Sequence, residues 1–170
     1  MKKLLLTSAV ITFCIFSINA QNESARHSNI NLSMGAELAK PIGLFGEVYS
    51  WGIGASAQAN FSIATNTALT LYTGYNNYFL ETTYGGGSEG FIPVLGGVEV
   101  GLSHVVFTSA QLGLTFYTNG GGNGSAFTFS PGIGFRLSRK FTALLKYIGK
   151  VKSAINSSAI GIRTAYVFGK

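Results

Sequence analysis

The sequence predicts an all-β fold, an eight-stranded antiparallel up-and-down transmembrane β-barrel. Between residues 29 and 168, eight stretches alternate apolar residues with small or polar ones at a period of two. Successive side chains of a strand point to opposite faces, so each stretch has one apolar face. Long and short breaks alternate between the stretches, which is typical of a barrel whose strands cross a membrane in turn.

The first twenty residues have the pattern of a secretory signal peptide. Lys2 and Lys3 precede a mostly apolar run over residues 4–18, and Ala20 ends the segment with a small residue. The run is shorter than the roughly 20 residues of a spanning helix, so we expect cleavage after Ala20. The single cysteine, Cys14, would be lost with it, which excludes disulfides and thiol chemistry. Residues 21–28 would form a short periplasmic segment and residues 29–170 the barrel.

The composition after residue 20 also favours a barrel in a membrane. The chain has 23 glycines, 13% aromatic residues and only 11% charged residues, which is unusual for a soluble domain. No later run is apolar enough for a spanning helix. Because lipid offers no hydrogen-bond partners to the backbone, membrane residence then requires a closed barrel.

The first four strands are predicted at 29–39, 51–63, 68–79 and 92–103. Their inward faces carry mainly Gly, Ser, Thr, Asn and Gln, and Asn77 is the polar exception on the outward face. The outward sets, strand by strand, are Ile30, Leu32, Met34, Ala36 and Leu38; Trp51, Ile53, Ala55, Ala57, Ala59, Phe61 and Ile63; Leu69, Leu71, Thr73, Tyr75 and Phe79; and Ile92, Val94, Val98, Val100 and Leu102.

The last four strands are predicted at 106–118, 126–138, 140–151 and 158–168. Pro131 lacks an amide donor, so we expect a bulge or weakened pairing there. The outward sets are Val106, Ala110, Leu112, Leu114 and Phe116; Phe127, Phe129, Ile133, Phe135 and Leu137; Phe141, Ala143, Leu145 and Tyr147; and Ile160, Ile162, Thr164, Tyr166 and Phe168.

The breaks predict an orientation. Those at 64–67, 104–105 and 138–140 are short, whereas those at 40–50, 80–90, 119–125 and 152–157 are longer. Outer-membrane barrels have short periplasmic turns and longer outer loops, so both termini should be periplasmic. Outward aromatic residues then form two girdles rather than ordinary packing clusters: Trp51, Phe79, Phe116 and Phe127 at the outer end, and Phe61, Phe135, Phe141, Tyr166 and Phe168 at the periplasmic end.

A soluble β-sandwich or lipocalin-like barrel would alternate in the same way. Such a fold buries its apolar face and shows charge on the other. Here the second face is small and polar with sparse charge, which suits a narrow packed lumen. The pattern therefore favours the membrane barrel.

Six charged residues fall on the inward parity: Glu37, Glu99, Arg136, Lys146, Lys150 and Arg163. Eight strands leave an interior just wide enough for side chains, and unpaired buried charge is costly. We therefore expect a salt-bridged plug, with Glu99 paired to Arg163, Lys146 or both, and Glu37 near Lys150. The alternative is an ion-conducting pore with a wider lumen.

Lys150 and Lys152 could also meet lipopolysaccharide phosphates, or be solvated loop residues.

No catalytic or metal-binding constellation is visible. The histidines are His27, before the first strand, and His104, in a predicted turn, and the chain contains no Asp to orient either of them. Clustered His, Cys or carboxylates are also missing. Glycines 85–87 and 120–122 lack the lysine or helix start of a phosphate-binding loop. The basic residues form no nucleic-acid-binding stripe, so we expect no cofactor, no nucleic acid and no enzymatic activity.

Three segments carry a resemblance to a known family: Trp51-Gly52-Ile53-Gly54, residues 130–135 and Tyr166-Val167-Phe168. With them the chain resembles the small outer-membrane β-barrel family that includes OmpA- and OmpX-like barrels and stand-alone outer-membrane protein β-barrel domains. Tyr166 and Phe168 look like the aromatic signal that barrel insertion machinery reads, although Gly169 and Lys170 follow. The resemblance implies a monomer in the outer membrane of a Gram-negative bacterium, among lipid and lipopolysaccharide. It implies a structural or loop-mediated surface role. A lipid-modifying enzyme of the lipid A deacylase or palmitoyltransferase type is a weaker alternative.

Overall fold

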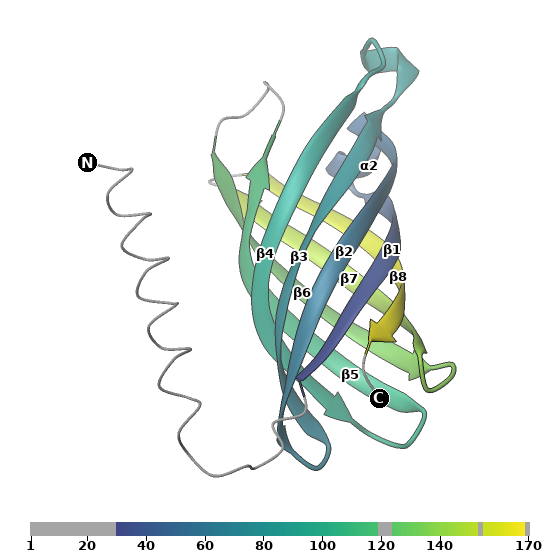
Figure 1. Ribbon diagram of the computed structural model, residues 1–170. Coiled ribbons are helices and arrows are strands. Elements are labelled where there is room, and N and C mark those ends of the chain that lie inside the picture. Colours follow the sequence, from purple (N-terminus) through teal and green to yellow (C-terminus); the bar gives the residue numbers. More distant parts are fainter. Residues whose placement is uncertain (1–29, 119–123, 153–154, 169–170) are drawn as a thin grey trace, which may run out of the picture.

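A computed structural model of the protein describes residues 30–118, 124–152 and 155–168. Eight strands form a closed barrel in which each strand pairs antiparallel with its sequence neighbours and β1 pairs with β8 (Figure 1). The predicted fold class is therefore confirmed. The predicted signal peptide and the segment 21–28 lie outside the described residues. The strands are β1 (Ile30–Ile42), β2 (Tyr49–Ala64), β3 (Thr67–Leu80), β4 (Ser88–Gly101), β5 (Val106–Tyr117), β6 (Ser125–Arg136), β7 (Phe141–Lys152) and β8 (Ile155–Phe168).

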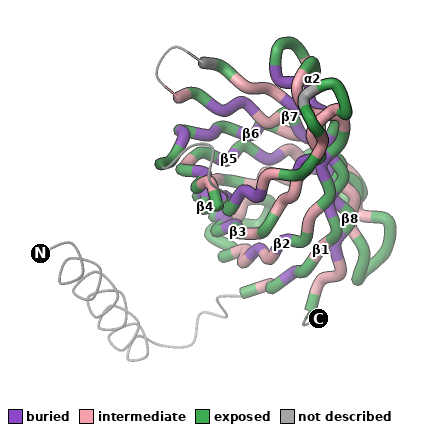
Figure 2. The backbone as a smooth tube through the Cα atoms, turned by 90° about the horizontal axis from the view of Figure 1, so that it is seen from above, coloured by how far each residue is buried: buried purple, intermediate pink, exposed green. Residues whose placement is uncertain are grey.

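The outside of the barrel is apolar, and the inside is largely polar. Buried and exposed residues alternate along the strands (Figure 2). Leu112 is 60% exposed whereas its neighbour Gln111 is 4% exposed. The outward sets predicted above follow the same pattern, because all of their members are exposed or half-buried. None of the described helices is long and apolar enough to cross a membrane.

The two ends of the barrel differ. The loop end carries the connections β1–β2, β3–β4, β5–β6 and β7–β8, with α2 (Leu44–Val48) in the first and η1 (Thr82–Tyr84) in the second. The turn end carries the other three connections, the first residues of β1 and the last residues of β8. The β3–β4 hairpin reaches farthest beyond the barrel (Figure 1). The aromatic residues of the predicted outer girdle lie at the loop end, and those of the predicted periplasmic girdle lie at the turn end.

Two strands, β4 and β8, begin three or more residues earlier than predicted. The segment 152–157 is not a long loop, because Lys152 pairs with Ile155 and Lys150 with Ser157. Likewise β4 begins at Ser88, so Phe91 is an inward strand residue, 2% exposed. Backbone pairing does not require apolar side chains, so Ser, Asn and Gly can continue a ladder past the apolar band.

The expected weakness at Pro131 is confirmed. On the β5 side, Pro131 pairs opposite Ala110. On the β7 side, the ladder stops at the pair Phe129–Gly149 and resumes at Gly132–Lys146 without a change of register. Proline has no backbone N–H to donate, which explains an interruption without a bulge.

Candidate functional site

A buried carboxylate organises the middle of the lumen. Glu37 lies on β1, opposite Arg163 of β8 in the ladder, and is 5% exposed. Lys146 of β7 places its Nζ 3.0 Å from Glu37 Oε2. The Tyr72 hydroxyl of β3 donates to Glu37 Oε1 at 2.5 Å, and Arg163 Nε lies 3.8 Å from the same oxygen. These four residues, which we call the central network, join four strands across the barrel.

Further hydrogen bonds engage donors of the central network. Arg163 Nε donates to Ser56 Oγ at 2.8 Å and its Nη2 donates to Ser33 Oγ at 3.1 Å. Lys146 Nζ also donates to the Tyr72 hydroxyl at 3.1 Å. A buried ion pair is stable only when its other polar atoms are bonded, and the inward serines meet that need.

A second ion pair lies nearer the turn end. Arg136 Nη2 is 3.4 Å from Glu99 Oε1, and Asn60 donates to Glu99 Oε2 at 3.0 Å. Both charged side chains keep contact with solvent, at 34% exposure for Arg136 and 13% for Glu99. The predicted pairings of Glu99 with Arg163 or Lys146 are therefore wrong. Parity fixes the face on which a residue lies, whereas its height also depends on strand stagger, and Glu99 lies near the turn-end limit of β4.

Lys150 occupies an aromatic environment instead of meeting Glu37. Its Nζ lies 3.6 Å from the ring centroid of Phe91, 4.7 Å from that of Tyr78 and 5.1 Å from that of Phe45. The residue is 5% exposed. The predictions that Lys150 pairs with Glu37 and that it faces lipopolysaccharide are both wrong. Its side chain points into the lumen, four residues along β7 from Lys146 and nearer the loop end. Lys152 is half-buried, with its Nζ 4.4 Å from the Tyr117 ring.

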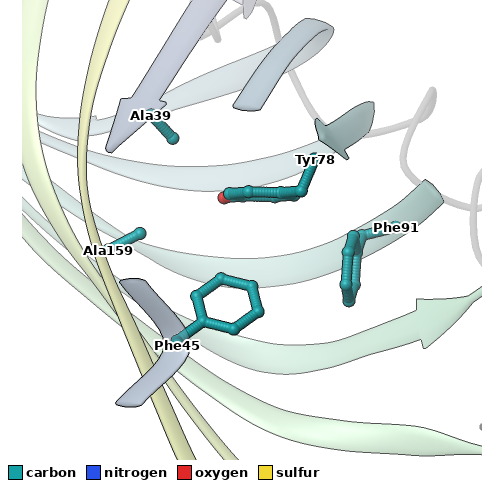
Figure 3. Close-up of a cluster of buried hydrophobic side chains, with 5 residues drawn as sticks. All are labelled: Ala39, Phe45, Tyr78, Phe91 and Ala159. Atoms are coloured by element: carbon teal, nitrogen blue, oxygen red, sulfur yellow. The ribbon is translucent and has the colours of Figure 1, made fainter. Parts of the chain in front are cut away.

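The loop end of the lumen is filled by apolar side chains. Phe45 of α2 points toward Tyr78 and Phe91, with ring centroids 5.4 and 6.4 Å away (Figure 3). Ala39 and Ala159 complete this group, which we call the loop-end cluster. Sequence reasoning missed it because α2 is too short to show a periodic pattern. The signal available in the sequence was Tyr78, a large ring on an inward face that is otherwise mainly small and polar.

Two cavities lie on either side of the central network. The larger, 730 Å³, lies at the turn end and is lined by Asn60, Glu99 and Arg136, with Arg163 among its deeper residues. The smaller, 20 Å³, lies between Lys146 and Lys150. The layer formed by Glu37, Tyr72 and Lys146 lies between the two.

The remaining predicted residues are dispersed. His104 is exposed between β4 and β5, and His27 lies outside the described residues. Within the described ranges, no three His, Cys, Asp or Glu residues are grouped to hold a metal. Tyr166 and Phe168 lie at the turn end of β8 with ring centroids 5.0 Å apart.

Comparisons with known proteins place the fold. No family model matches the chain, and no curated protein matches its sequence. Ail, an outer membrane protein of Yersinia pestis, matches with a TM-score of 0.58 at 12% identity, covering 81% of this chain and 99% of that one. The N-terminal β-barrel domain of Pseudomonas aeruginosa OprF matches with a TM-score of 0.54 at 14% identity, covering 81% and 97%. A chain from the de novo design of transmembrane β-barrels matches with a TM-score of 0.51 at 17% identity, covering 81% and 94%. The fold is thus that of small outer-membrane barrels.

Proposed function

We propose that this chain is a non-enzymatic outer-membrane β-barrel protein with a structural role or a role exercised through its loop end. The observation that carries the proposal is that side chains close the lumen at two levels. The central network fills the middle and the loop-end cluster fills the region beneath α2. A barrel closed at two levels offers its outer surface and its loops to partners rather than a path for solutes.

The proposal includes a location and an orientation. The apolar exterior and the fold support the outer membrane of a Gram-negative bacterium, with the loop end outside and both termini in the periplasm. Lipid and lipopolysaccharide would surround a monomer, because a closed barrel leaves no strand edge for pairing. Insertion machinery would read Tyr166 and Phe168. We also propose that the chain is related to OmpA- and OmpX-like barrels.

Single cysteines test the orientation, since the mature chain would have none. Thr83→Cys lies in the β3–β4 connection and Asn66→Cys in the β2–β3 turn, and both positions are exposed. A membrane-impermeant maleimide applied to intact cells should label Thr83→Cys and spare Asn66→Cys. Lysed cells should label both. Labelling of Asn66→Cys alone in intact cells would show that the barrel has the opposite orientation.

The β3–β4 hairpin is the part of the loop end that we propose to contact partners. It projects farthest (Figure 1), and Gly85, Gly86 and Gly87 have φ values of 87°, 68° and 110°, which side chains rarely adopt. The folded barrel should therefore be used in a cell-binding and pull-down screen beside a variant in which residues 82–87 are replaced by Asn-Gly. Loss of a captured ligand with this variant supports the proposal, and retention assigns binding elsewhere.

A narrow pore is the second candidate, because the turn-end cavity of 730 Å³ is lined mainly by polar residues and occupies part of the lumen. Planar-bilayer recording separates the two functions. A plugged barrel should show no steady open level. A reproducible single-channel conductance from the wild-type protein would favour the pore and remove the main support for the first proposal.

A further inference from the structure

The small cavity in the lumen has an unusual lining. It lies between the central network and the loop-end cluster and is bordered by Lys146, Lys150 and Ser130. No carboxylate is among the described residues that line it. Its volume is 20 Å³, and a cavity needs about 10–15 Å³ to hold one water molecule. The space therefore suits a single small species.

Two residues that line this cavity each have a polar atom without a partner. Lys150 Nζ and Ser130 Oγ are buried, and neither has a hydrogen-bond partner among the described residues. Thr128 pairs with Lys150 in the β6–β7 ladder, and Ser130 is the next inward residue on β6. Ser130 and Lys150 therefore line the cavity from the adjoining strands β6 and β7. Buried polar groups are normally hydrogen-bonded, so two unpartnered atoms at one cavity point to an absent ligand.

The charge balance indicates the sign of that ligand. The buried charged residues of the described lumen are Glu37, Lys146, Lys150 and Arg163, three cations and one carboxylate. Lys146 and Arg163 already share Glu37. The rings around Lys150 attract its ammonium group, but they do not neutralise its charge. A buried excess of positive charge is costly without a counter-charge.

We propose that this cavity binds one small monovalent anion, chloride in ordinary salt. Lys150 Nζ and Ser130 Oγ donate to it, and Lys146, four residues before Lys150 on β7, contributes further positive charge. The anion would neutralise Lys150 and link β6 and β7 where Pro131 interrupts their ladder. This site is independent of any pore or surface activity of the barrel.

Stability against urea tests the proposal directly. The full-length mature protein, folded in detergent micelles, is unfolded at constant ionic strength while chloride or bromide replaces gluconate, which is too large for the cavity. Because a ligand that binds only the folded state stabilises it by mass action, each tenfold rise in halide above its dissociation constant should raise the folding equilibrium constant about tenfold. Identical curves in chloride, bromide and gluconate would overturn the proposal.

Two variants and a control locate the effect. Lys150→Met keeps an apolar side chain against the rings and should abolish the halide dependence, and Ser130→Ala should weaken it by removing one donor. Lys152→Met removes a charge two residues away and should leave the dependence unchanged. If Lys150→Met does not fold, Ser130→Ala still decides. A halide dependence that persists in Lys150→Met, or that is undiminished in Ser130→Ala, contradicts the site.

Crystals grown in bromide give a positional test. An anomalous peak between Lys150 and Ser130 is expected in the wild-type protein and should be absent from Lys150→Met. An ordered water without anomalous signal in the cavity, or bromide bound only outside the barrel, would overturn the proposal.

Discussion

At the scale of the residue, Glu37 is the most consequential side chain of the lumen. It is bonded by Lys146 and Tyr72 and lies 3.8 Å from Arg163. Glu37→Gln would leave two buried cations without their carboxylate, and breaking a buried pair from one side costs roughly 3–5 kcal/mol. Combining it with Lys146→Met removes both partners of the closest pair. Urea unfolding from lipid vesicles should show the double variant to be clearly more stable than the sum of the single effects predicts.

The pair of Glu99 and Arg136 is the matched control. These side chains retain 13% and 34% exposure, so solvent can compensate for a lost partner. Glu99→Gln with Arg136→Met should be nearly additive, with a coupling of about 1 kcal/mol or less. If the stability effects of Glu37→Gln and Lys146→Met are as additive as those of this control pair, Glu37 does not organise the lumen.

The same residues show what the sequence could predict of the site. Alternation was sufficient to identify Glu37, Lys146 and Arg163 as inward residues, because parity is a local property of a strand. Which of them meet depends on the stagger between strands, a property of the closed barrel. The phenol hydroxyl of Tyr72 donates a hydrogen bond to Glu37. No local sequence pattern distinguishes Tyr72 from Tyr78, which lies beside Lys150.

At the scale of the element, the strands were predicted well and their ends less well. The apolar alternation marks the band that lipid would contact, whereas β4 and β8 continue beyond it through Ser88 and Asn156. Their pairing uses backbone groups alone, so it leaves no hydropathy signal. Helix α2 leaves none either, since its five residues are fewer than two helical turns.

The interruption at Pro131 gives a prediction for an element. Pro131 is exposed on the outer face, and the β6–β7 ladder is broken at this point. Pro131→Val would restore a donor in a residue suited to strands. The change should stabilise the barrel by about 0.5–1.5 kcal/mol, the usual net value of one hydrogen bond. It should also slow amide exchange in β7 around Tyr147 and Ile148, and unchanged exchange there would mean that the proline is not the cause of the break.

At the scale of the whole molecule, closure of the sheet gives the last prediction. The pairing of β1 with β8 runs from Leu32–Phe168 to Ile42–Ser158, so every strand has two partners. Unfolding cannot begin at a free edge and must open a ladder in a medium that offers no hydrogen bonds to the backbone. The folded protein should therefore resist dodecyl sulfate at room temperature and migrate as a compact species in gel electrophoresis, whereas boiling should shift it to its full mass of 17.9 kDa, less the signal peptide if that is cleaved. Replacing Ala36 and Leu38 by proline removes two donors from β1 and should abolish the compact band. Equal migration of boiled and unboiled wild-type protein would contradict the closed barrel itself.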